Sequence, residues 1–332
     1  MKKLLVVFGG QSSEHEISCI SAGNVLENVD TGKYHVTRAG ISEAGEWFEF
    51  KGSNKSVKSN EWLKEKENLA EIKDIMGLIK GHDVAFPVLH GKYGEDGTIQ
   101  GLFELCGVKY VGCGVLASSV GMDKEYTKIL AGIHSVPVVP YQAFARGQEV
   151  AVDKNIVGEY PLIIKPCNAG SSYGITKVSN QVDLMKAVRL AFEYDQKLLI
   201  EKFIPAREIE CAVLGNMELI VSEPGEILSA NELYDFDAKY NNQKSRTEIP
   251  ANLSKEQIDK IKAYAEKIFR GINGRGLSRV DFFISKENGE IYFNEVNTLP
   301  GFTDISMYPK MMEYSGFSYS ELIDRLIELA CM

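Results

Sequence analysis

The chain has 332 residues, of which 44% are hydrophobic, and this length predicts two or three domains with sizeable cores rather than a disordered protein. Its formal net charge of −9 argues against nucleic acid or an anionic membrane as a partner, because both select basic surfaces. The six cysteines are scattered without a C-x-x-C pair, so neither a zinc site nor a disulfide framework is predicted. The apolar run after Met1 is too short for a signal peptide, so a cytoplasmic location is expected.

The first third of the chain predicts an open α/β domain. Residues 4–8 form an apolar strand that ends at Gly9-Gly10, and a helical pattern follows over about 17–26. A second buried strand is predicted over 84–89, and it leads into the glycine-rich segment that begins at His90. The G-x-G-x-x-G spacing of dinucleotide-binding loops is missing, which disfavours a dehydrogenase.

The middle of the chain predicts a smaller α+β domain between about residues 113 and 204. One strand over 162–165 leads into the small polar loop 168–174, and another over 197–200 ends at Glu201. Such a loop can fold its backbone N–H groups over phosphates, although loops of this composition are often simple turns. Lys165 at the strand end is either a solvated surface lysine or a cation held over phosphate.

Two further features are predicted towards the C-terminus. Residues 231–250 are polar and without a clear period, which predicts a long loop that acts as a lid. Ser254 and Gln257 predict a capping box for an amphipathic helix to about residue 272, and Ser318 with Glu321 starts the closing helix in the same way.

Residues 278–297 predict a two-stranded hairpin with polar side chains on one face. A three-residue loop with Gly289 left-handed would pair Lys286 with Glu290 and place Asp281 opposite Glu295. Opposed carboxylates destabilise a sheet unless a cation lies between them, and hard oxygen ligands suit Mg²⁺ bound jointly with phosphate. The alternative is a solvated charged face. The side chains on this face are Arg279, Asp281, Glu295 and Asn297.

Six motifs resemble the D-alanine-D-alanine ligases of the ATP-grasp superfamily, in the same order and over essentially the whole chain. They are GGQSSEHEIS at 9–18, HGKYGEDGTIQG at 90–101, MDK at 122–124, KPCNAGSSYG at 165–174, YDFDAKY at 234–240 and NEVNTLPGFT at 294–303. The resemblance implies a three-domain ATP-grasp fold of α/β and α+β type. An N-terminal open α/β substrate domain over 1–112 would precede a central module over 113–204 and a C-terminal catalytic module over 205–332, and these two α+β modules would sandwich ATP.

The resemblance also implies a reaction. ATP would phosphorylate the carboxylate of one D-alanine, and the amine of a second D-alanine would attack the acyl phosphate, giving D-alanyl-D-alanine for peptidoglycan precursor synthesis. Glu14 matches the carboxylate that receives the first substrate's ammonium, with Ser171 and Tyr240 as its hydrogen-bonded partners. Arg279 and the backbone N–H of Gly301 match the oxyanion donors.

The remaining matched positions concern the nucleotide, the metal and the second substrate. Lys124 and Lys165 match phosphate-binding lysines, Glu201 the adenine contact and Glu208 the ribose contact, and Ser172, Lys202 and Lys239 complete the ATP-binding set. Asp281, Glu295 and Asn297 match the ligands of Mg²⁺, for which Mn²⁺ can substitute. His90, Ser306 and Met307 match the second-substrate region, although His90 is equally consistent with a structural role.

Alternatives within and beyond this family are open to test. A D-alanine-D-serine ligase would keep the same motifs, but its relatives often carry arginine where this chain has the apolar Met307. The Lys239-Tyr240 pair and the absence of histidine from 231–250 disfavour D-lactate. Another ATP-grasp ligase, such as a glutathione synthetase or a biotin carboxylase, should lack Glu14 with HGKYGEDG, and a catalytically inactive nucleotide-binding regulator should have lost Arg279 or a metal ligand.

One departure and one further expectation complete the resemblance. Asn168-Ala169 precedes Gly170 where many relatives carry a charged residue, so the local affinity for ATP can differ. Relatives are commonly homodimers through the N-terminal domain, and the apolar stretch 99–111 is either such a surface or part of the core.

Overall fold

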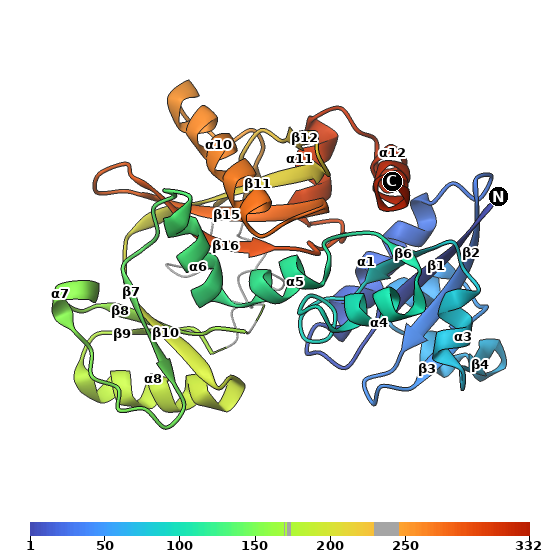
Figure 1. The fold of residues 1–332 in the computed structure, drawn as a ribbon, viewed down its shortest axis with the longest axis horizontal. Helices are drawn as coiled ribbons and strands as arrows, with labels where there is room; N and C mark the ends of the chain where they lie inside the picture. Colours follow the sequence, from blue (N-terminus) through green and yellow to red (C-terminus); the bar gives the residue numbers. More distant parts are fainter. Residues whose placement is uncertain (169, 171–173, 229–245) are drawn as a thin grey trace.

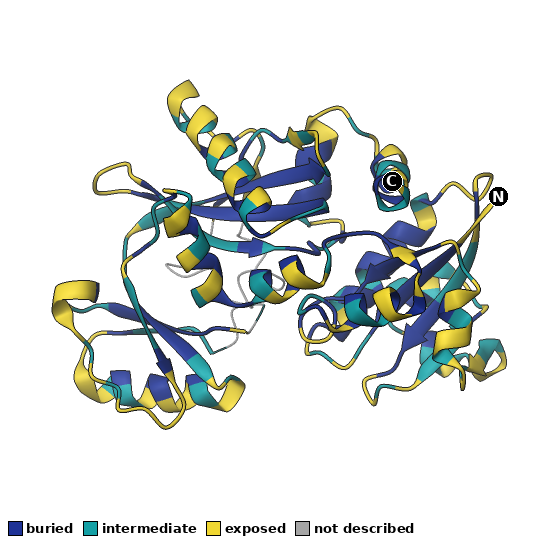
Figure 2. Cartoon of the chain, in the orientation of Figure 1, coloured by how far each residue is buried: buried dark blue, intermediate teal, exposed yellow. Residues whose placement is uncertain are grey.

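The computed structural model describes residues 1–168, 170, 174–228 and 246–332. These residues form three β-sheets that follow one another along the chain (Figure 1). Figure 2 shows that buried residues concentrate in the strands and on the inner faces of the helices. Within the described residues, no helix is long and apolar enough to cross a membrane.

The first sheet has six strands and is mostly parallel. In chain order they are β1 (Lys2–Gly9), β2 (Tyr34–Ile41), β3 (Trp47–Phe50), β4 (Leu69–Glu71), β5 (Val84–Val88) and β6 (Lys109–Tyr110). Their spatial order is β4-β3-β2-β1-β5-β6. Residues 4–8 of β1 are apolar and fully buried, as expected for a parallel strand covered on both faces. The carboxyl ends of β1 and β5 therefore open at the same sheet edge, where open α/β domains bind ligands.

Helices and short turns cover this first sheet. They are α1 (His15–Asn28), α2 (Asn54–Lys58), η1 (Trp62–Lys64), η2 (Lys66–Asn68), α3 (Ile75–Lys80) and α4 (Thr98–Cys106). The predicted strands over 4–8 and 84–89 and the predicted helix over 17–26 are confirmed.

The second sheet is small and antiparallel, in the order β7-β10-β8-β9. Its elements are β7 (Tyr141–Ala145), α7 (Lys154–Val157), β8 (Leu162–Pro166), β9 (Thr176–Val178), α8 (Gln181–Tyr194) and β10 (Lys197–Lys202). The predicted strands over 162–165 and 197–200 are confirmed. Because β8 and β10 pair antiparallel, Lys165 stands opposite Leu199 and Glu201 opposite Ile163, so the two charged side chains share one face of the sheet.

The third sheet is antiparallel, and the hairpin predicted from the sequence forms one side of it. Its strands are β11 (Ala206–Gly215), β12 (Leu219–Val221), β13 (Gly225–Leu228), β14 (Arg246–Glu248), β15 (Gly276–Ser285) and β16 (Ile291–Asn297). The helices that follow or interrupt it are α10 (Lys255–Gly271), α11 (Met307–Tyr314) and α12 (Tyr319–Cys331). Both predicted capping boxes, at Ser254 with Gln257 and at Ser318 with Glu321, are present.

Three helices connect the sheets to one another. Helices α5 (Val115–Met122) and α6 (Lys124–Ile133) pack against β16 of the third sheet (Figure 1). The closing helix α12 returns to β5, β6 and α1 of the first sheet, so the first and third sheets share one apolar core. The domain bounds 1–112, 113–204 and 205–332 stay a prediction.

The hairpin reaches its expected register by a different route. The turn is one residue longer than predicted, because Ser285 rather than Lys286 bonds to Glu290. A bulge then follows between the pairs Phe282 with Phe293 and Asp281 with Glu295, and it leaves Asn294 as the extra residue. The bulge offsets the longer turn, so Asp281 stands opposite Glu295 and Arg279 opposite Asn297, as predicted.

Two other expectations need correction or limits. Residues 246–248, expected as part of a long loop, form the edge strand β14, which pairs with β13 although its residues are polar and exposed. Such an edge strand is held by its backbone ladder and leaves no apolar pattern in the sequence. Residues 231–245 of the expected lid lie outside the described residues. The stretch 99–111 is mostly core, and Leu105 is its one widely exposed apolar side chain.

Candidate functional site

One pocket lies between the carboxyl edge of the first sheet and the hairpin of the third. Residues from β15, β16 and the loop 298–306 form one wall, and residues from the loops after β1 and β5 form the other. The pocket collects nine of the residues singled out from the sequence. These are Glu14, His90, Lys124, Arg279, Glu295, Asn297, Gly301, Ser306 and Met307.

Glu14 is held at the start of α1 by contacts between the loops after β1 and β5. Its backbone N–H donates to Ser12 Oγ at 3.1 Å, and the Ser12 hydroxyl donates to the carbonyl of His90 at 2.6 Å. A Cβ at position 91, where φ is +69°, would lie 2.6 Å from a Glu14 carboxylate oxygen. Only glycine at this position therefore lets the loop approach Glu14 so closely. Gly170 also approaches Glu14, since a Cβ there would lie 3.0 Å from the same oxygen.

Glu95 is a pocket residue that the sequence reasoning did not single out. Its carboxylate accepts from the backbone N–H of Gly91 at 2.7 Å. Burial, together with the negative charge of Glu14, raises the pKa of Glu95 to about 8. The sequence could have indicated this residue, because Glu95 is the first acidic residue of the glycine-rich segment HGKYGEDG, which follows a strand end.

His90 is buried and ties the first domain to the loop that contains Gly301. Its Nδ1 lies 3.2 Å from the carbonyl oxygen of Leu299, which can only accept, so Nδ1 carries the proton. Its Nε2 then accepts from the Ser21 hydroxyl at 3.0 Å, and Ser21 Oγ accepts from the Phe302 N–H at 3.1 Å. This chain of bonds fixes the loop on both sides of Gly301. Ser21 was not singled out from the sequence.

The hairpin wall carries a buried ion cluster around Arg279. The guanidinium donates to both carboxylate oxygens of Asp281, at 2.8 and 2.7 Å, and its Nε lies 3.1 Å from Glu210. Burial alone would lower the pKa of Arg279, but the charges of Asp281 and Glu210 outweigh it and raise the pKa well above its ordinary value. The alternation that placed Arg279 and Asp281 on one face did not reveal Glu210, which comes from the neighbouring strand β11.

Glu295 and Asn297 complete the predicted metal ligands on this wall. Glu295 is partly exposed and lies 3.4 Å from Lys124, and the Asn297 amide lies 3.1 Å from Asp281. Among the described residues, no group of three His, Cys, Asp or Glu side chains is gathered for a metal. The predicted set has two carboxylates and an amide oxygen, which are hard ligands suited to Mg²⁺, and the register places the two carboxylates opposite each other.

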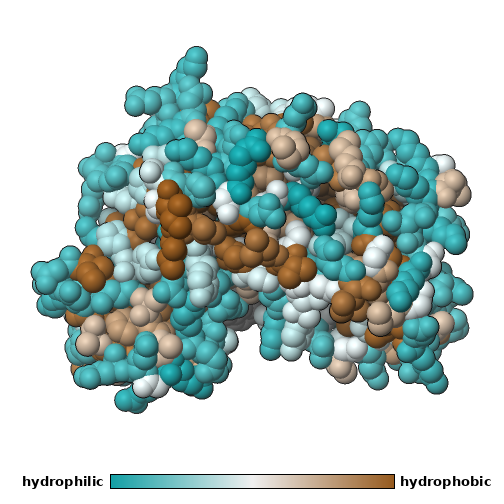
Figure 3. Space-filling view, in the orientation of Figure 1, coloured by the Kyte–Doolittle hydropathy of each residue, from teal (hydrophilic) through white to brown (hydrophobic). Residues whose placement is uncertain are grey.

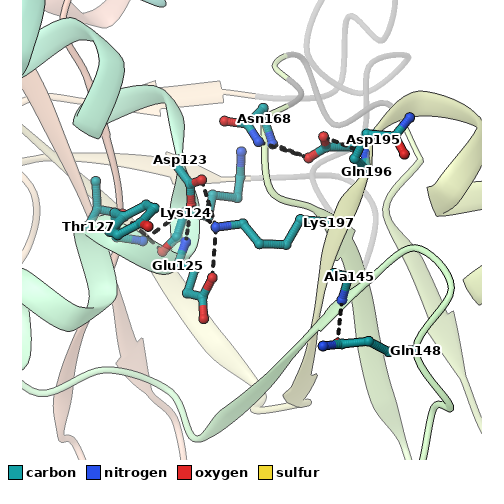
Figure 4. Close-up of polar contacts among 11 residues, drawn as sticks. Asp123, Lys124, Glu125, Thr127, Ala145, Gln148, Asn168, Asp195, Gln196 and Lys197 are labelled. Carbon is teal, nitrogen blue, oxygen red and sulfur yellow. Dashed lines mark hydrogen bonds and ion pairs between the residues drawn. The ribbon is translucent and has the colours of Figure 1, made fainter.

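Lys124 begins α6, and an ion-pair clamp next to it holds the start of that helix. Asp123 caps the helix by accepting from the N–H groups of Glu125 and Tyr126, at 3.0 and 3.2 Å. Lys197 on β10 reaches across to both Asp123 and Glu125, each at 2.7 Å (Figure 4). The backbone N–H of Lys124 also donates to the carbonyl of Cys167 at 3.1 Å, which joins the helix to the loop after β8.

A buried group of three charged side chains, the lysine triad, joins this helix to the second sheet and consists of Lys128 on α6, Lys165 on β8 and Glu201 on β10. Lys165 Nζ lies 2.8 Å from one Glu201 oxygen, and Lys128 Nζ lies 2.9 Å from the other. Lys165 also donates to the side chain of Asn294, the bulge residue, at 3.2 Å. Burial alone would raise the pKa of Glu201, but the two ammonium groups lower it to about 2.

Of the remaining predicted positions, two do not line the pocket, two form a turn in its wall, and four lie outside the described residues. Glu208 is half-buried on β11, opposite Phe283, and Lys202 is an exposed residue at the end of β10. Ser306 Oγ accepts from the Thr303 N–H at 3.0 Å, and a Cβ at Gly301 would lie 2.8 Å from it, so this turn is tightly folded. Four predicted residues lie outside the described residues: Ser171, Ser172, Lys239 and Tyr240.

Two family models match nearly the whole chain. The model described as "D-ala D-ala ligase N-terminus" matches residues 3–113, and that described as "D-ala D-ala ligase C-terminus" matches residues 130–328.

Relatives and solved structures agree with these matches. The chain is 48% identical to a D-alanine--D-alanine ligase of Ruminiclostridium cellulolyticum over 99% of this chain and 95% of the relative. It is 48% identical to that of Clostridium acetobutylicum over 99% of this chain and 98% of the relative. The structure resembles the VanG D-Ala:D-Ser ligase of Enterococcus faecalis, with 41% identity, a TM-score of 0.90 and coverage of 99% of each chain. It also resembles the ligase of Coxiella burnetii, with 34% identity, a TM-score of 0.87 and coverage of 100% of this chain and 95% of that chain.

Proposed function

Because the chain belongs to the D-alanine-D-alanine ligase family, we propose that it joins two D-alanine molecules to D-alanyl-D-alanine at the expense of ATP, in an ATP-grasp fold. The ATP γ-phosphate passes to the carboxylate of the first D-alanine, and the amine of the second displaces phosphate from the acyl phosphate. The product is a peptidoglycan precursor, and the reaction takes place in the cytoplasm, where ATP is available.

The observation that carries the proposal is the convergence of unlike groups on one pocket. Glu14 supplies a carboxylate for an ammonium group on one wall, and Arg279 supplies a guanidinium on the other. The Gly301 N–H lies on a loop that His90 and Ser21 tie down. Arg279 and Gly301 are the proposed donors to oxygen charge in the acyl-transfer steps, because preorganised donors stabilise such charge more than the neutral substrate. Closure of the pocket around bound substrates would protect an acyl phosphate from water.

The nucleotide would be held by lysines and a divalent metal. Lys124 and Lys165 are the proposed phosphate contacts, and Glu201 and Glu208 the proposed adenosine contacts. The donor chemistry of Asp281, Glu295 and Asn297 fits Mg²⁺, or Mn²⁺ in its place. When bound, such an ion neutralises phosphate charge during transfer. Ser171, Ser172, Lys239 and Tyr240 stay proposed contacts on the resemblance alone.

D-alanine is the proposed second substrate. Met307 is buried and contributes apolar surface to the lining of the pocket, next to Ser306, while its terminal methyl group packs against Gly225. An apolar lining suits the methyl group of D-alanine better than the hydroxymethyl group of D-serine, by about 1 to 3 kcal/mol. A D-alanine-D-serine ligase is the alternative, and the similarity to the VanG structure favours testing it directly.

A coupled phosphate-release assay tests the proposal. Purified protein is given ATP, Mg²⁺ and D-alanine, and then D-alanine with D-serine or D-lactate in competition. We expect phosphate release with D-alanine alone and a higher kcat/KM for D-alanine than for D-serine as second substrate. A preference for D-serine would leave the ligase mechanism intact but replace the substrate, and no phosphate release with any D-amino acid would reject the ligase function.

A homodimer is the proposed assembly, and an exposed apolar surface supports it. Six of the exposed apolar side chains lie on three successive helices, and Figure 3 shows apolar surface gathered over α5 and α6. They are Leu105 on α4, Val115 and Leu116 on α5, and Tyr126, Ile129 and Ile133 on α6. Light scattering at micromolar concentration should give a dimer, and Leu116→Lys should shift it to monomer while Met217→Lys, at an exposed position elsewhere, should not. A monomeric wild-type protein would reject the dimer.

A further inference from the structure

Lys128 is a fully buried lysine for which the proposed mechanism has no role. It lies on α6 one turn after Lys124, and its side chain is 1% exposed. Burial lowers the pKa of Lys128, and the charge of Lys165 adds to this effect, whereas the carboxylate of Glu201 opposes it. A buried ammonium is costly, and its retention needs a physical reason.

In the triad, the carboxylate of Glu201 pairs with two lysines, one at each oxygen. Glu201 presents one oxygen to Lys128 at 2.9 Å and the other to Lys165 at 2.8 Å. The contact to Lys128 is an ion pair without hydrogen-bond geometry, so Lys128 acts here through its charge. Two ammonium groups and one carboxylate leave the triad with a formal charge of +1.

Of the two lysines, Lys165 is the one whose positive charge can act on a ligand. Lys128 lies at the closed end of the triad, fully buried and 5.7 Å above the ring of Tyr141. Lys165 lies at the other end, where it donates to Asn294 at the bulge of the hairpin that carries Glu295. If Lys128 were absent, Glu201 would cancel the charge of Lys165 at short range, and Lys165 would attract phosphate less strongly.

We propose that Lys128 neutralises Glu201 and thereby keeps the positive charge of Lys165 available to a nucleotide phosphate. This inference rests on the proposed ATP-dependent function and adds a positioning residue to it. Lys128 itself does not touch the nucleotide. It acts through Glu201 on the strength of the phosphate contact at Lys165.

Calorimetric binding of two probes separates this role from a purely structural one. A non-hydrolysable ATP analogue with an imido link between its β- and γ-phosphates reports the phosphate contact, and adenosine reports the rest of the nucleotide site. Lys128→Met keeps the length of the side chain and removes its charge. It should weaken binding of the ATP analogue about 10-fold and change the affinity for adenosine by less than about threefold. Unchanged binding of the ATP analogue, or equal losses for both probes, would overturn the proposal.

A double-mutant cycle tests the route through Glu201. In the background of Glu201→Gln no carboxylate competes for Lys165, so adding Lys128→Met should leave the ratio of the two affinities unchanged within about threefold. A further loss in the double variant would show that Lys128 acts on the nucleotide directly and would reject the proposal. The double variant also serves if Lys128→Met alone fails to fold, because replacing both members of a buried ion pair is often neutral for stability.

Lys262→Met is the matched control for Lys128→Met. Lys262 on α10 also pairs with one carboxylate, that of Glu223, and lies outside the pocket and the triad. Lys262→Met should leave both affinities unchanged. Failure of the wild type to bind the ATP analogue would reject the proposed function itself, whereas tight binding that Lys128→Met does not alter would reject only the role of Lys128.

Discussion

Two charged clusters in this protein have opposite formal charges. The hairpin cluster joins two cations with three carboxylates, for a net charge of −1: Lys124, Arg279, Glu210, Asp281 and Glu295. The lysine triad of Lys128, Lys165 and Glu201 joins two cations with one carboxylate, for a net charge of +1. Because a negative cluster attracts a metal ion and a positive one attracts phosphate, the metal and the phosphates of the proposed nucleotide complex would meet different surroundings.

The substitution with the largest expected effect removes the central cation of the hairpin cluster and lowers the stability of the fold. Arg279→Met leaves the buried carboxylates of Asp281 and Glu210 without their shared cation, which should lower the free energy of unfolding by about 3 to 5 kcal/mol. Urea unfolding measures this. The control is Arg207→Met, because Arg207 is partly exposed and pairs with one carboxylate, Glu226, so the loss should be clearly smaller. Equal losses in the two variants would contradict the assignment.

The next effect concerns turnover rather than stability. Glu295→Gln keeps the shape of the side chain but removes a proposed metal-ligand charge, so kcat should fall about 100- to 1,000-fold with the fold intact. Phosphate release measures the rate, and circular dichroism checks the fold. Glu290→Gln, at the exposed turn of the same hairpin, should keep full activity. Wild-type turnover in Glu295→Gln would remove Glu295 from the metal site.

The stability that the lysine triad gives to the fold should depend on pH, because Glu201 must be ionised to pair with its two lysines. The pKa of its carboxyl is about 2 in the folded protein against 4.5 ordinarily, so the stabilisation that it gives is present above pH 4.5 and is lost as the pH falls towards 2. This difference corresponds to about 3 kcal/mol. The stability of the wild type relative to Glu201→Gln should therefore be greatest above pH 5 and shrink below 4.5. A difference that stays constant over this range would show that Glu201 is not held ionised by its lysines.

The smallest expected effect is on kcat, and it comes from Ser21, an uncharged residue that lies in neither of the two charged clusters. Ser21→Ala removes the hydroxyl that joins His90 to the Phe302 N–H, and the Gly301 loop should loosen. We expect kcat to fall about 10-fold, equivalent to about 1.4 kcal/mol, with an unchanged KM for ATP. Ser18→Ala, at a buried serine of the same helix that bonds within the first sheet, is the control. A raised KM for ATP in Ser21→Ala, or an equal fall of kcat in both variants, would contradict this role.

The sequence by itself determined the local parts of this protein. Alternation along the strands placed Arg279 and Asp281 on one face, and the pairing of Asp281 with Glu295 was predicted although the turn was one residue too short in that prediction. The bulge at Asn294 corrects the register, and no local pattern announces it. The capping boxes of α10 and α12 were also predictable, because a cap depends on residues three positions apart.

Only the tertiary structure decided which distant charges meet. Lys128, Lys165 and Glu201 come from α6, β8 and β10, and each alone has the sequence signature of an ordinary surface residue. The same holds for Glu210, which reaches Arg279 from the neighbouring strand. Their effect on one another depends on distance and burial, which are set when the helix and the sheets pack together. Periodicity and spacing report only contacts within one element or one hairpin, and for that reason the sequence could propose residues for the candidate site but not the balance of charge around them.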